Sequence, residues 1–147
     1  MIAPPTNPKR RKTMETTDYC NYDLSLALKE CGFNEPCDHY YTPNKAMRIV
    51  KDNALAPETA NNRFLDEIDD GCCAAVPLWQ AQKWLREKGT AVSVQANEIQ
   101  GELWYSADII TTKGINELVD GGFDYMGYEA ALSAGISSAL ELIKEGE

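Results

Sequence analysis

The sequence predicts an α+β fold: a small, mainly antiparallel sheet with two principal helices packed on one face. Residues 77–88 and 128–144 repeat apolar side chains at helical spacing, whereas residues 90–96 and 102–108 alternate apolar and polar side chains as strands do. The segment "NEIQG" between the alternating stretches provides a turn, so they are predicted to form a hairpin. Together these elements indicate a single α+β domain over residues 14–147.

The first elements are predicted to be a short helix and a tyrosine-rich strand. "DLSLALKECGF" places its leucines near one side of a helix that the following glycine ends. Tyr40 and Tyr41 favour a strand, and Pro43 followed by Asn44 favours a turn. The segment from Lys45 onward fits a return strand and, nearly equally well, a helix with its apolar residues on one face.

Proline and glycine delimit two further helices. In "APETANNRFLDEIDDG", Pro57 suits the first helical position and Gly71 a stop. In "VPLWQAQKWLREKG", Pro77 opens the helix and Gly89 ends it. The predicted apolar positions are Ala60, Phe64 and Ile68 in the first helix and Leu78, Ala81, Trp84 and Leu85 in the second.

The closing helix is built from unusually small side chains. The segment "TTKGINELVDGG" before this helix is predicted to be a loop with at most one helical turn. The apolar face of the closing helix is expected to consist of Tyr128, Ala131, Leu132, Gly135, Ala139, Leu142 and Ile143. A central glycine costs a helix about 1 kcal/mol relative to alanine, so we expect close packing at Gly135 to recover that cost. The alternative is that Gly135 is only a tolerated loss of stability.

Charge divides the chain into a basic leader and an acidic body. Within residues 1–13, Lys9, Arg10, Arg11 and Lys12 have no acid among them, although the net charge of the whole chain is −9. The leader is predicted to be disordered, and a natural start at Met14 is an alternative. The leader could contact nucleic acid, but the acidic body opposes binding to phosphate backbones, so a nucleic-acid partner is not expected.

The sequence favours a cytoplasmic location. No apolar run approaches the roughly 20 residues that cross a membrane, and no apolar segment of an export signal follows the basic residues. The cysteine count is odd, which fits reduced thiols. The five cysteines are Cys20, Cys31, Cys37, Cys72 and Cys73.

Catalytic and metal-binding patterns are weak. His39 is the one histidine, and Cys37 lies two residues before it, so on a strand both side chains would share a face. A Cys-His nucleophile or a zinc site that adds Cys31 and the Cys72-Cys73 pair would use these groups. No third orienting group and no C-x-x-C spacing supports either site. We therefore predict no catalytic residue, no cofactor and no metal ion.

Trp104 is the predicted anchor for a protein partner. If its neighbours on the strand face the helices, alternation sends Trp104 to the opposite face, where tryptophan can dominate binding energy. Two alternatives remain: residues 45–70 bury Trp104, or the sheet is inverted and Trp104 meets the helices. The polar neighbours expected around Trp104 are Glu102 and Ser106 on its own strand and Ser93 or Gln95 across the hairpin.

Residues 77–144 also follow the element order of a double-stranded RNA-binding domain. That domain reads RNA shape through basic side chains on its second helix. Here the closing helix carries Lys144 as its single base beside Glu129, Glu141 and Glu145. The topology thus suggests nucleic-acid binding as the alternative function, while the charges argue against it.

Three segments resemble small proteins from phages and prophages of gut Bacteroidales bacteria. "GCCAAVPLWQAQKWLREKG" is similar to that family's C-A-A-P-x-x-x-A-Q-K-W-L-R-E segment, and "FDYMGYEAALSAGISSALELI" is similar to its closing helix. "LKECGFNEPCDHYYTP" resembles its opening helix and tyrosine-rich strand. The resemblance implies a phage or prophage gene and supplies no catalytic residues. The leading interpretation is an accessory protein that binds a protein partner; an enzyme or zinc protein using Cys37 and His39 ranks third.

Deleting residues 1–13 is expected to leave the melting temperature nearly unchanged, because a disordered leader makes no contacts that stabilise the fold. Thermal unfolding of the full chain and of the shortened chain, followed by circular dichroism, checks this. A drop of several degrees would mean that the leader docks on the body.

Overall fold

The structure is a computed structural model that describes residues 18–52, 59–119 and 125–146. The leader with Lys9, Arg10, Arg11 and Lys12, and the alternative start at Met14, lie outside the described residues. The elements, in chain order, are α1 (Tyr22–Glu30), β1 (His39–Tyr41), β2 (Met47–Ile49), the 3-10 turn η2 (Val50–Asp52), α2 (Asn62–Ile68), β3 (Cys73–Ala74), α3 (Leu78–Glu87), β4 (Thr90–Ile99), β5 (Glu102–Thr111), β6 (Asn116–Leu118) and α4 (Tyr128–Glu145). The predicted α+β class is confirmed.

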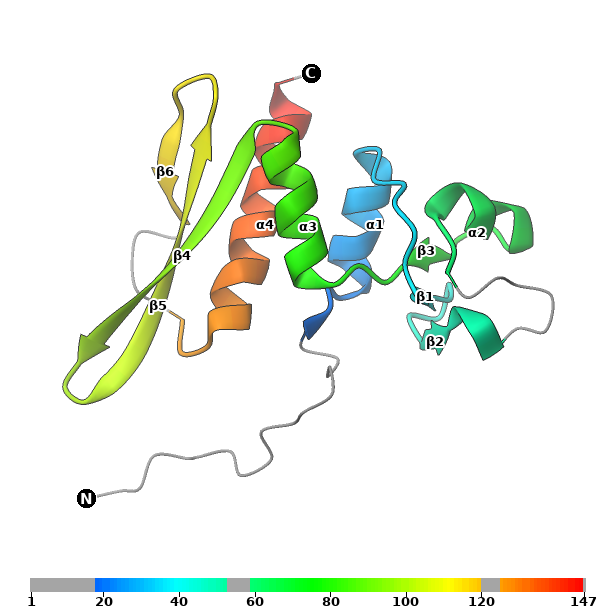
Figure 1. Ribbon diagram of the computed structural model, residues 1–147, viewed down its shortest axis with the longest axis horizontal. Helices are drawn as coiled ribbons and strands as arrows, with labels where there is room; N and C mark the ends of the chain where they lie inside the picture. Colours follow the sequence, from blue (N-terminus) through cyan, green and yellow to red (C-terminus); the bar gives the residue numbers. More distant parts are fainter. Residues whose placement is uncertain (1–17, 53–58, 120–124, 147) are drawn as a thin grey trace.

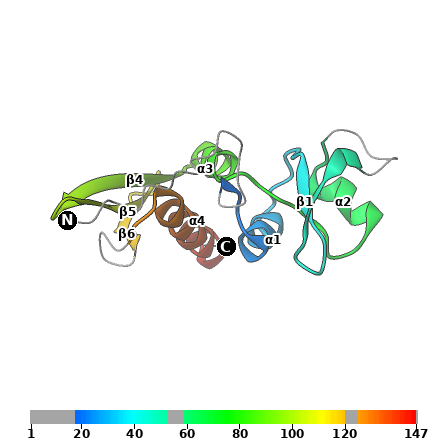
Figure 2. The same cartoon turned by 90° about the horizontal axis from the view of Figure 1, so that it is seen from below.

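The strands form two small antiparallel sheets in place of the single expected sheet. Their strand orders are β2-β1-β3 and β4-β5-β6. The sheets lie at opposite ends of the molecule, with α1, α3 and α4 between them (Figures 1 and 2). The tyrosine-rich strand does not join the hairpin, because β3 pairs with β1 through Tyr40–Ala74 and Tyr41–Cys73.

The described part of residues 45–70 forms the return strand and then a shorter helix than predicted. β2 pairs with β1, so the hairpin alternative is the correct one. α2 begins at Asn62 because the Asn61 side chain caps it, accepting a hydrogen bond from the Phe64 N–H at 2.8 Å. The prediction that Ala60 lies on this helix is wrong: Ala60 precedes it and bridges Cys37 through two backbone hydrogen bonds of 2.9 Å. Pro57 lies outside the described residues.

A buried amide joins α2 to both of its neighbours. The Asn62 side chain donates to the Phe33 carbonyl at 2.7 Å and accepts from the Ala74 N–H at 2.8 Å. Asn62 is 4% exposed, so both bonds form away from water, where an unpaired amide would be costly. The short strand β3 is therefore fixed by a side chain as well as by its ladder with β1.

The hairpin is longer than predicted and gains a third strand. β4 and β5 pair residue for residue from Thr90–Thr111 to Ile99–Glu102. The two-residue turn has positive φ at Gln100 (53°) and Gly101 (85°), the geometry that matches the twist of a tight hairpin. The prediction of a loop before α4 is wrong at Asn116–Leu118, which forms β6 against β5.

α4 packs on this hairpin at very short range. A Cβ built on Gly135 would lie 2.5 Å from Val92 Cγ1 and 3.1 Å from the Ala107 Cβ, so the glycine permits contact with both strands. The expectation of close packing at Gly135 is confirmed. The buried residues of α4 are Ala131, Leu132, Gly135, Ile136, Ala139 and Leu140.

The apolar core is continuous across the middle of the molecule. One cluster of buried side chains extends from Phe33 and Val50, near the first sheet, to Ile109 and Leu140 near the second. Phe33 meets Trp84 of α3 edge to face, with ring centroids 5.6 Å apart. Among the described helices, none combines the length and apolar character that crossing a membrane requires.

Replacing Gly135 with alanine is expected to lower the free energy of unfolding by about 1–3 kcal/mol, as overpacking does. The added methyl group meets Val92 Cγ1, and this clash outweighs the gain in helix propensity. Urea denaturation measures the change.

Two variants serve as controls for Gly135→Ala. Ser137→Ala, on the exposed side of the same helix, is expected to change stability little. Val92→Ala removes the group that clashes and is expected to reduce the effect of Gly135→Ala. A Gly135→Ala protein more stable than the wild type would contradict the close contact.

Candidate functional site

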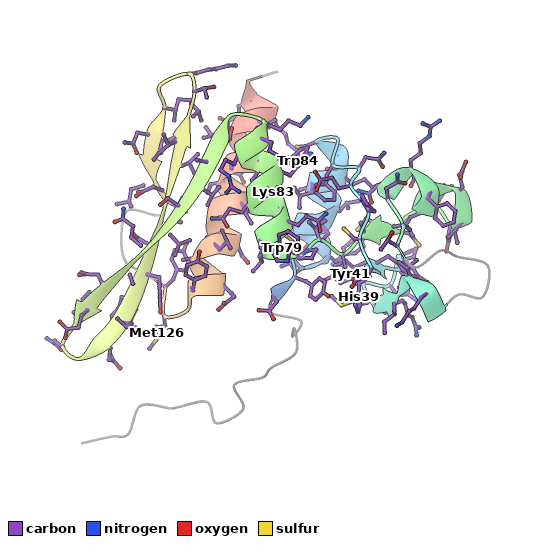
Figure 3. All side chains as sticks on the ribbon, in the orientation of Figure 1. His39, Tyr41, Trp79, Lys83, Trp84 and Met126 are labelled. Atoms are coloured by element: carbon purple, nitrogen blue, oxygen red, sulfur yellow. The ribbon has the colours of Figure 1, made fainter. Side chains whose placement is uncertain are left out.

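An apolar hollow lies where α3 and α4 begin. Its volume is about 260 Å³, and its lining residues are Asp18, Leu78, Trp79, Tyr128, Glu129 and Leu132. Trp79 is 59% exposed and Tyr128 is 42% exposed, although both are large apolar groups. Figure 3 shows Trp79 at the base of α3 and Met126 near the start of α4. Large exposed aromatic groups beside a hollow are typical of interaction sites.

Helical geometry places Trp79 outside the core. α3 buries Leu78, Ala81, Trp84 and Leu85, and Trp79 falls off this stripe, since successive helical residues point about 100° apart. Tyr128 is the first residue of α4 and packs edge to face on Tyr105 of β5, with ring centroids 6.1 Å apart. The hairpin therefore holds the Tyr128 ring at the rim of the hollow.

The exposed apolar groups continue beyond the hollow. Leu103 lies two residues before Tyr105 on the same side of β5 and is 55% exposed. Met126 is 63% exposed; it follows Tyr125, whose backbone pairs with that of Tyr105 at 2.7 and 3.2 Å. We name the set Trp79, Tyr128, Tyr105, Leu103 and Met126, with the hollow, the Trp79–Tyr128 surface.

The charges at the hollow are acidic. Asp18 and Glu129 are the charged groups among its described lining residues, which include neither lysine nor arginine. Such a hollow favours a partner segment that combines apolar side chains with basic ones.

Trp104 lies on the other side of the hairpin from this surface. Tyr105 faces α4, so alternation directs Trp104 away from that helix. The strand register places Asn97 directly across from Trp104, with the pairs Gln95–Ser106 and Ile99–Glu102 next to it and Ser93 opposite Asp108. Trp104 is half-buried and Ser106 is buried, while Ile99 and Ile110 on the same side are 40% and 45% exposed, so apolar groups are exposed on both sides of the hairpin.

Trp79 and Tyr128 were not predicted as site residues from the sequence. The exposure of Trp79 could have been predicted, because Trp79 is not part of the apolar stripe predicted for residues 77–88. Tyr128 was predicted to lie on the buried face of the closing helix, but its ring contacts the hairpin only through Tyr105 and is 42% exposed.

Cys37 and His39 have separate partners. The Cys37 Sγ lies 3.8 Å from the Glu35 carbonyl oxygen and from Gln80 Oε1. His39 Nδ1 lies 2.8 Å from Asp38 Oδ1 and 3.3 Å from the Tyr19 hydroxyl. Burial, with the nearby carboxylates of Asp38 and Glu35, raises the pKa of the Cys37 thiol to about 12. A cysteine nucleophile needs the opposite shift, so this environment disfavours thiolate chemistry at Cys37.

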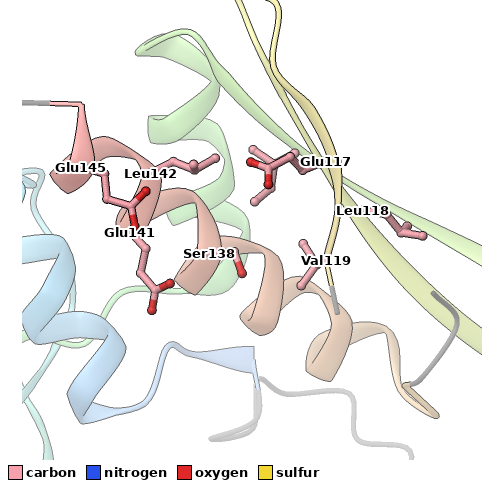
Figure 4. Close-up of a pocket in the computed structure, with 8 residues that line it drawn as sticks. Glu117, Leu118, Val119, Ser138, Glu141, Leu142 and Glu145 are labelled. Carbon is pink, nitrogen blue, oxygen red and sulfur yellow. The ribbon is translucent and has the colours of Figure 1, made fainter. Parts of the chain in front are cut away.

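A second hollow, of about 240 Å³, lies between β6 and the C-terminal half of α4 and contains three glutamates. These are Glu117, Glu141 and Glu145. Figure 4 shows their carboxylates lying apart around the hollow. Within the described ranges, no group of three histidine, cysteine, aspartate or glutamate side chains is placed to hold a metal ion. None of the five cysteines forms a disulfide.

The order α3, β4, β5, β6, α4 is that of a double-stranded RNA-binding domain, now with three strands. The side chains at the start of α4 do not suit phosphate groups, because Glu129 is acidic and the basic Lys144 lies in the last turn. Comparisons with family profiles, with curated proteins and with solved structures find no match to this chain.

Thiol labelling at pH 8 is expected to modify Cys31 first, because Cys31 is partly exposed whereas the other four cysteines are buried. Burial also raises the pKa of Cys37 and of Cys73 to about 12, so at pH 8 their reactive thiolate forms are scarce in the native protein. Mass spectrometry of the labelled peptides checks the order. Cys31→Ser is expected to remove the fast phase, and denaturant to release the remaining thiols. Rapid labelling of Cys37 in the native protein would contradict the buried environment.

Proposed function

We propose that this chain is a non-enzymatic accessory protein of a phage or prophage that acts in the cytoplasm of its bacterial host by binding a protein partner. The observation that carries the proposal is the exposure of Trp79 and Tyr128 around an apolar hollow. The resemblance of three segments to small proteins of Bacteroidales phages supports the genomic origin.

The partner is expected to present an apolar side chain next to a basic one. The hollow can receive the apolar group, and Asp18 and Glu129 at its rim favour a positive charge nearby. The aromatic rings supply contact area with little loss of side-chain entropy, since each has only two rotatable bonds.

Nucleic-acid binding is the second candidate, and the element order from α3 to α4 is the observation that favours it. The net charge of −9 and Glu129 in the first turn of α4 oppose it, because phosphate contacts require basic side chains.

Capture from a Bacteroidales host lysate tests the proposal. A tagged wild-type chain is expected to retain a specific protein that Trp79→Ala and Tyr128→Ala variants bind more weakly. Truncating a binding-site aromatic typically costs about 2 kcal/mol, which is roughly a thirtyfold loss of affinity. The captured protein is then purified, and its affinity for each variant is measured by calorimetry.

Ile49→Ala and Ile68→Ala are matched controls, because these side chains are also exposed and apolar but lie in the other sheet and in α2. They are expected to leave binding unchanged. An equal loss of affinity in the site variants and in these controls would refute the assignment of this surface as the binding site. Capture that survives the double substitution of Trp79 and Tyr128 by alanine would refute it as well. Binding to double-stranded RNA at physiological salt would favour the second candidate instead.

A further inference from the structure

β4 has a long outer edge that no strand of the described chain covers. The sheet order β4-β5-β6 puts β4 at the border, and its pairing with β5 runs without a bulge over ten residues. Figures 1 and 2 show the far half of the β4–β5 hairpin projecting beyond α3 and α4. We call residues 95–104 the hairpin arm; residues 95–103 are all exposed.

The register decides which backbone groups point outward from β4. A two-residue turn makes Ile99–Glu102 a hydrogen-bonded pair. The backbone N–H and C=O groups of alternate β4 residues, starting at Glu98, therefore point away from β5. Two contacts agree with this alternation. The Gln82 side chain donates to the outward Val92 carbonyl at 2.8 Å, and Tyr105, which is opposite Ala96, turns its own backbone outward to Tyr125. The N–H and C=O groups of Val94, Ala96 and Glu98 therefore face outward.

This edge lacks the usual protection against strand pairing. Natural edge strands carry lysine, proline or a bulge that prevents another strand from adding. Gln82 covers the Val92 carbonyl, but from residue 93 to residue 99 the strand has no lysine, no proline and no bulge. Its single charged side chain is Glu98.

We propose that β4 pairs antiparallel with β4 of a second copy of this chain, with the two-fold axis at Ala96, to form a continuous six-stranded sheet. In this register Ala96 is opposite its own equivalent, and Val94 is opposite Glu98 of the second copy. The backbone N–H and C=O groups of these three residues point outward. The pair at Ala96 and the two Val94–Glu98 pairs therefore form about six backbone hydrogen bonds.

The side chains favour a second copy of the chain as the occupant. On the side away from α4, Gln95 is opposite Asn97 of the second copy, and two neutral amides can hydrogen-bond across the strands. On the side facing α4, each Glu98 meets a valine, and the two glutamates lie four residues apart along the strands. The small Ala96 at the axis allows close approach. The edge is thus complementary to itself without placing like charges opposite each other.

This proposal is independent of the proposed function, because it concerns the β4 edge and a second copy instead of the Trp79–Tyr128 surface and a different protein. Light scattering after gel filtration, at physiological salt or above, is expected to give twice the mass of the chain. High salt is chosen because two chains of net charge −9 repel each other at low ionic strength.

Cysteine cross-linking tests the register. In Ala96→Cys the two thiols would sit on residues with Cα atoms about 5.5 Å apart, within disulfide range. In Glu98→Cys, equally exposed on the same strand, the equivalent residues would be roughly 14 Å apart along the strands and cannot bridge. Mild oxidation is expected to convert most Ala96→Cys chains to dimers and to leave Glu98→Cys at the level of the wild type.

Ala96→Pro completes the test. It removes an outward N–H without breaking the β4–β5 ladder, so it is expected to give a folded monomer with unchanged circular dichroism. A wild-type monomer, equal cross-linking at positions 96 and 98, or a dimer that survives Ala96→Pro would overturn the proposal.

Discussion

The close contact between Gly135 of α4 and the β4–β5 hairpin is the constraint on which the rest of the structure depends. A side chain at this position would overlap Val92, which is stiff because it branches at Cβ, and Ala107, which has no side-chain torsion to change. Large residues flank this point, so α4 crosses the sheet with its backbone near the strands at the root of the hairpin. That contact fixes the direction in which the hairpin leaves the helices and brings Tyr105 to Tyr128.

Long periodic segments were predictable from sequence, and short ones were not. α3, α4 and the hairpin each contain enough residues to display a helical or alternating pattern, and their positions agree with the prediction within a few residues. β3 has two residues and β6 has three, which is too few for any period to be read. The first sheet also depends on Asn62, whose amide joins Phe33 to Ala74; local sequence cannot reveal a bond between such distant segments.

The candidate site shows the same division. The exposure of Trp79 follows from its place outside the apolar stripe of α3, so the sequence contained that signal. The hollow itself requires Asp18, Leu78 and Tyr128 to meet from three distant segments, and only the folded chain brings them together. Tyr128 has the spacing of a core residue, but it is the first residue of α4 and its ring meets the hairpin only edge to face at Tyr105, so it stays 42% exposed. Periodicity carries no information about where the neighbouring elements end.

The hairpin arm is intrinsically unstable, and contacts with the rest of the fold do not compensate for this. An isolated two-stranded ribbon is marginally stable in water, and among the described residues the arm is such a ribbon beyond the Tyr105–Tyr125 pair. Its tip depends on the β4–β5 ladder and on the Gln100–Gly101 turn, while Leu103 and Ile99 stay exposed to solvent. A third strand along β4 would pair the outward N–H and C=O groups and extend the sheet on which these side chains lie. The arm therefore gains order when its edge is occupied. Pairing with a second copy would thus account both for its exposed side chains and for its unpaired backbone groups.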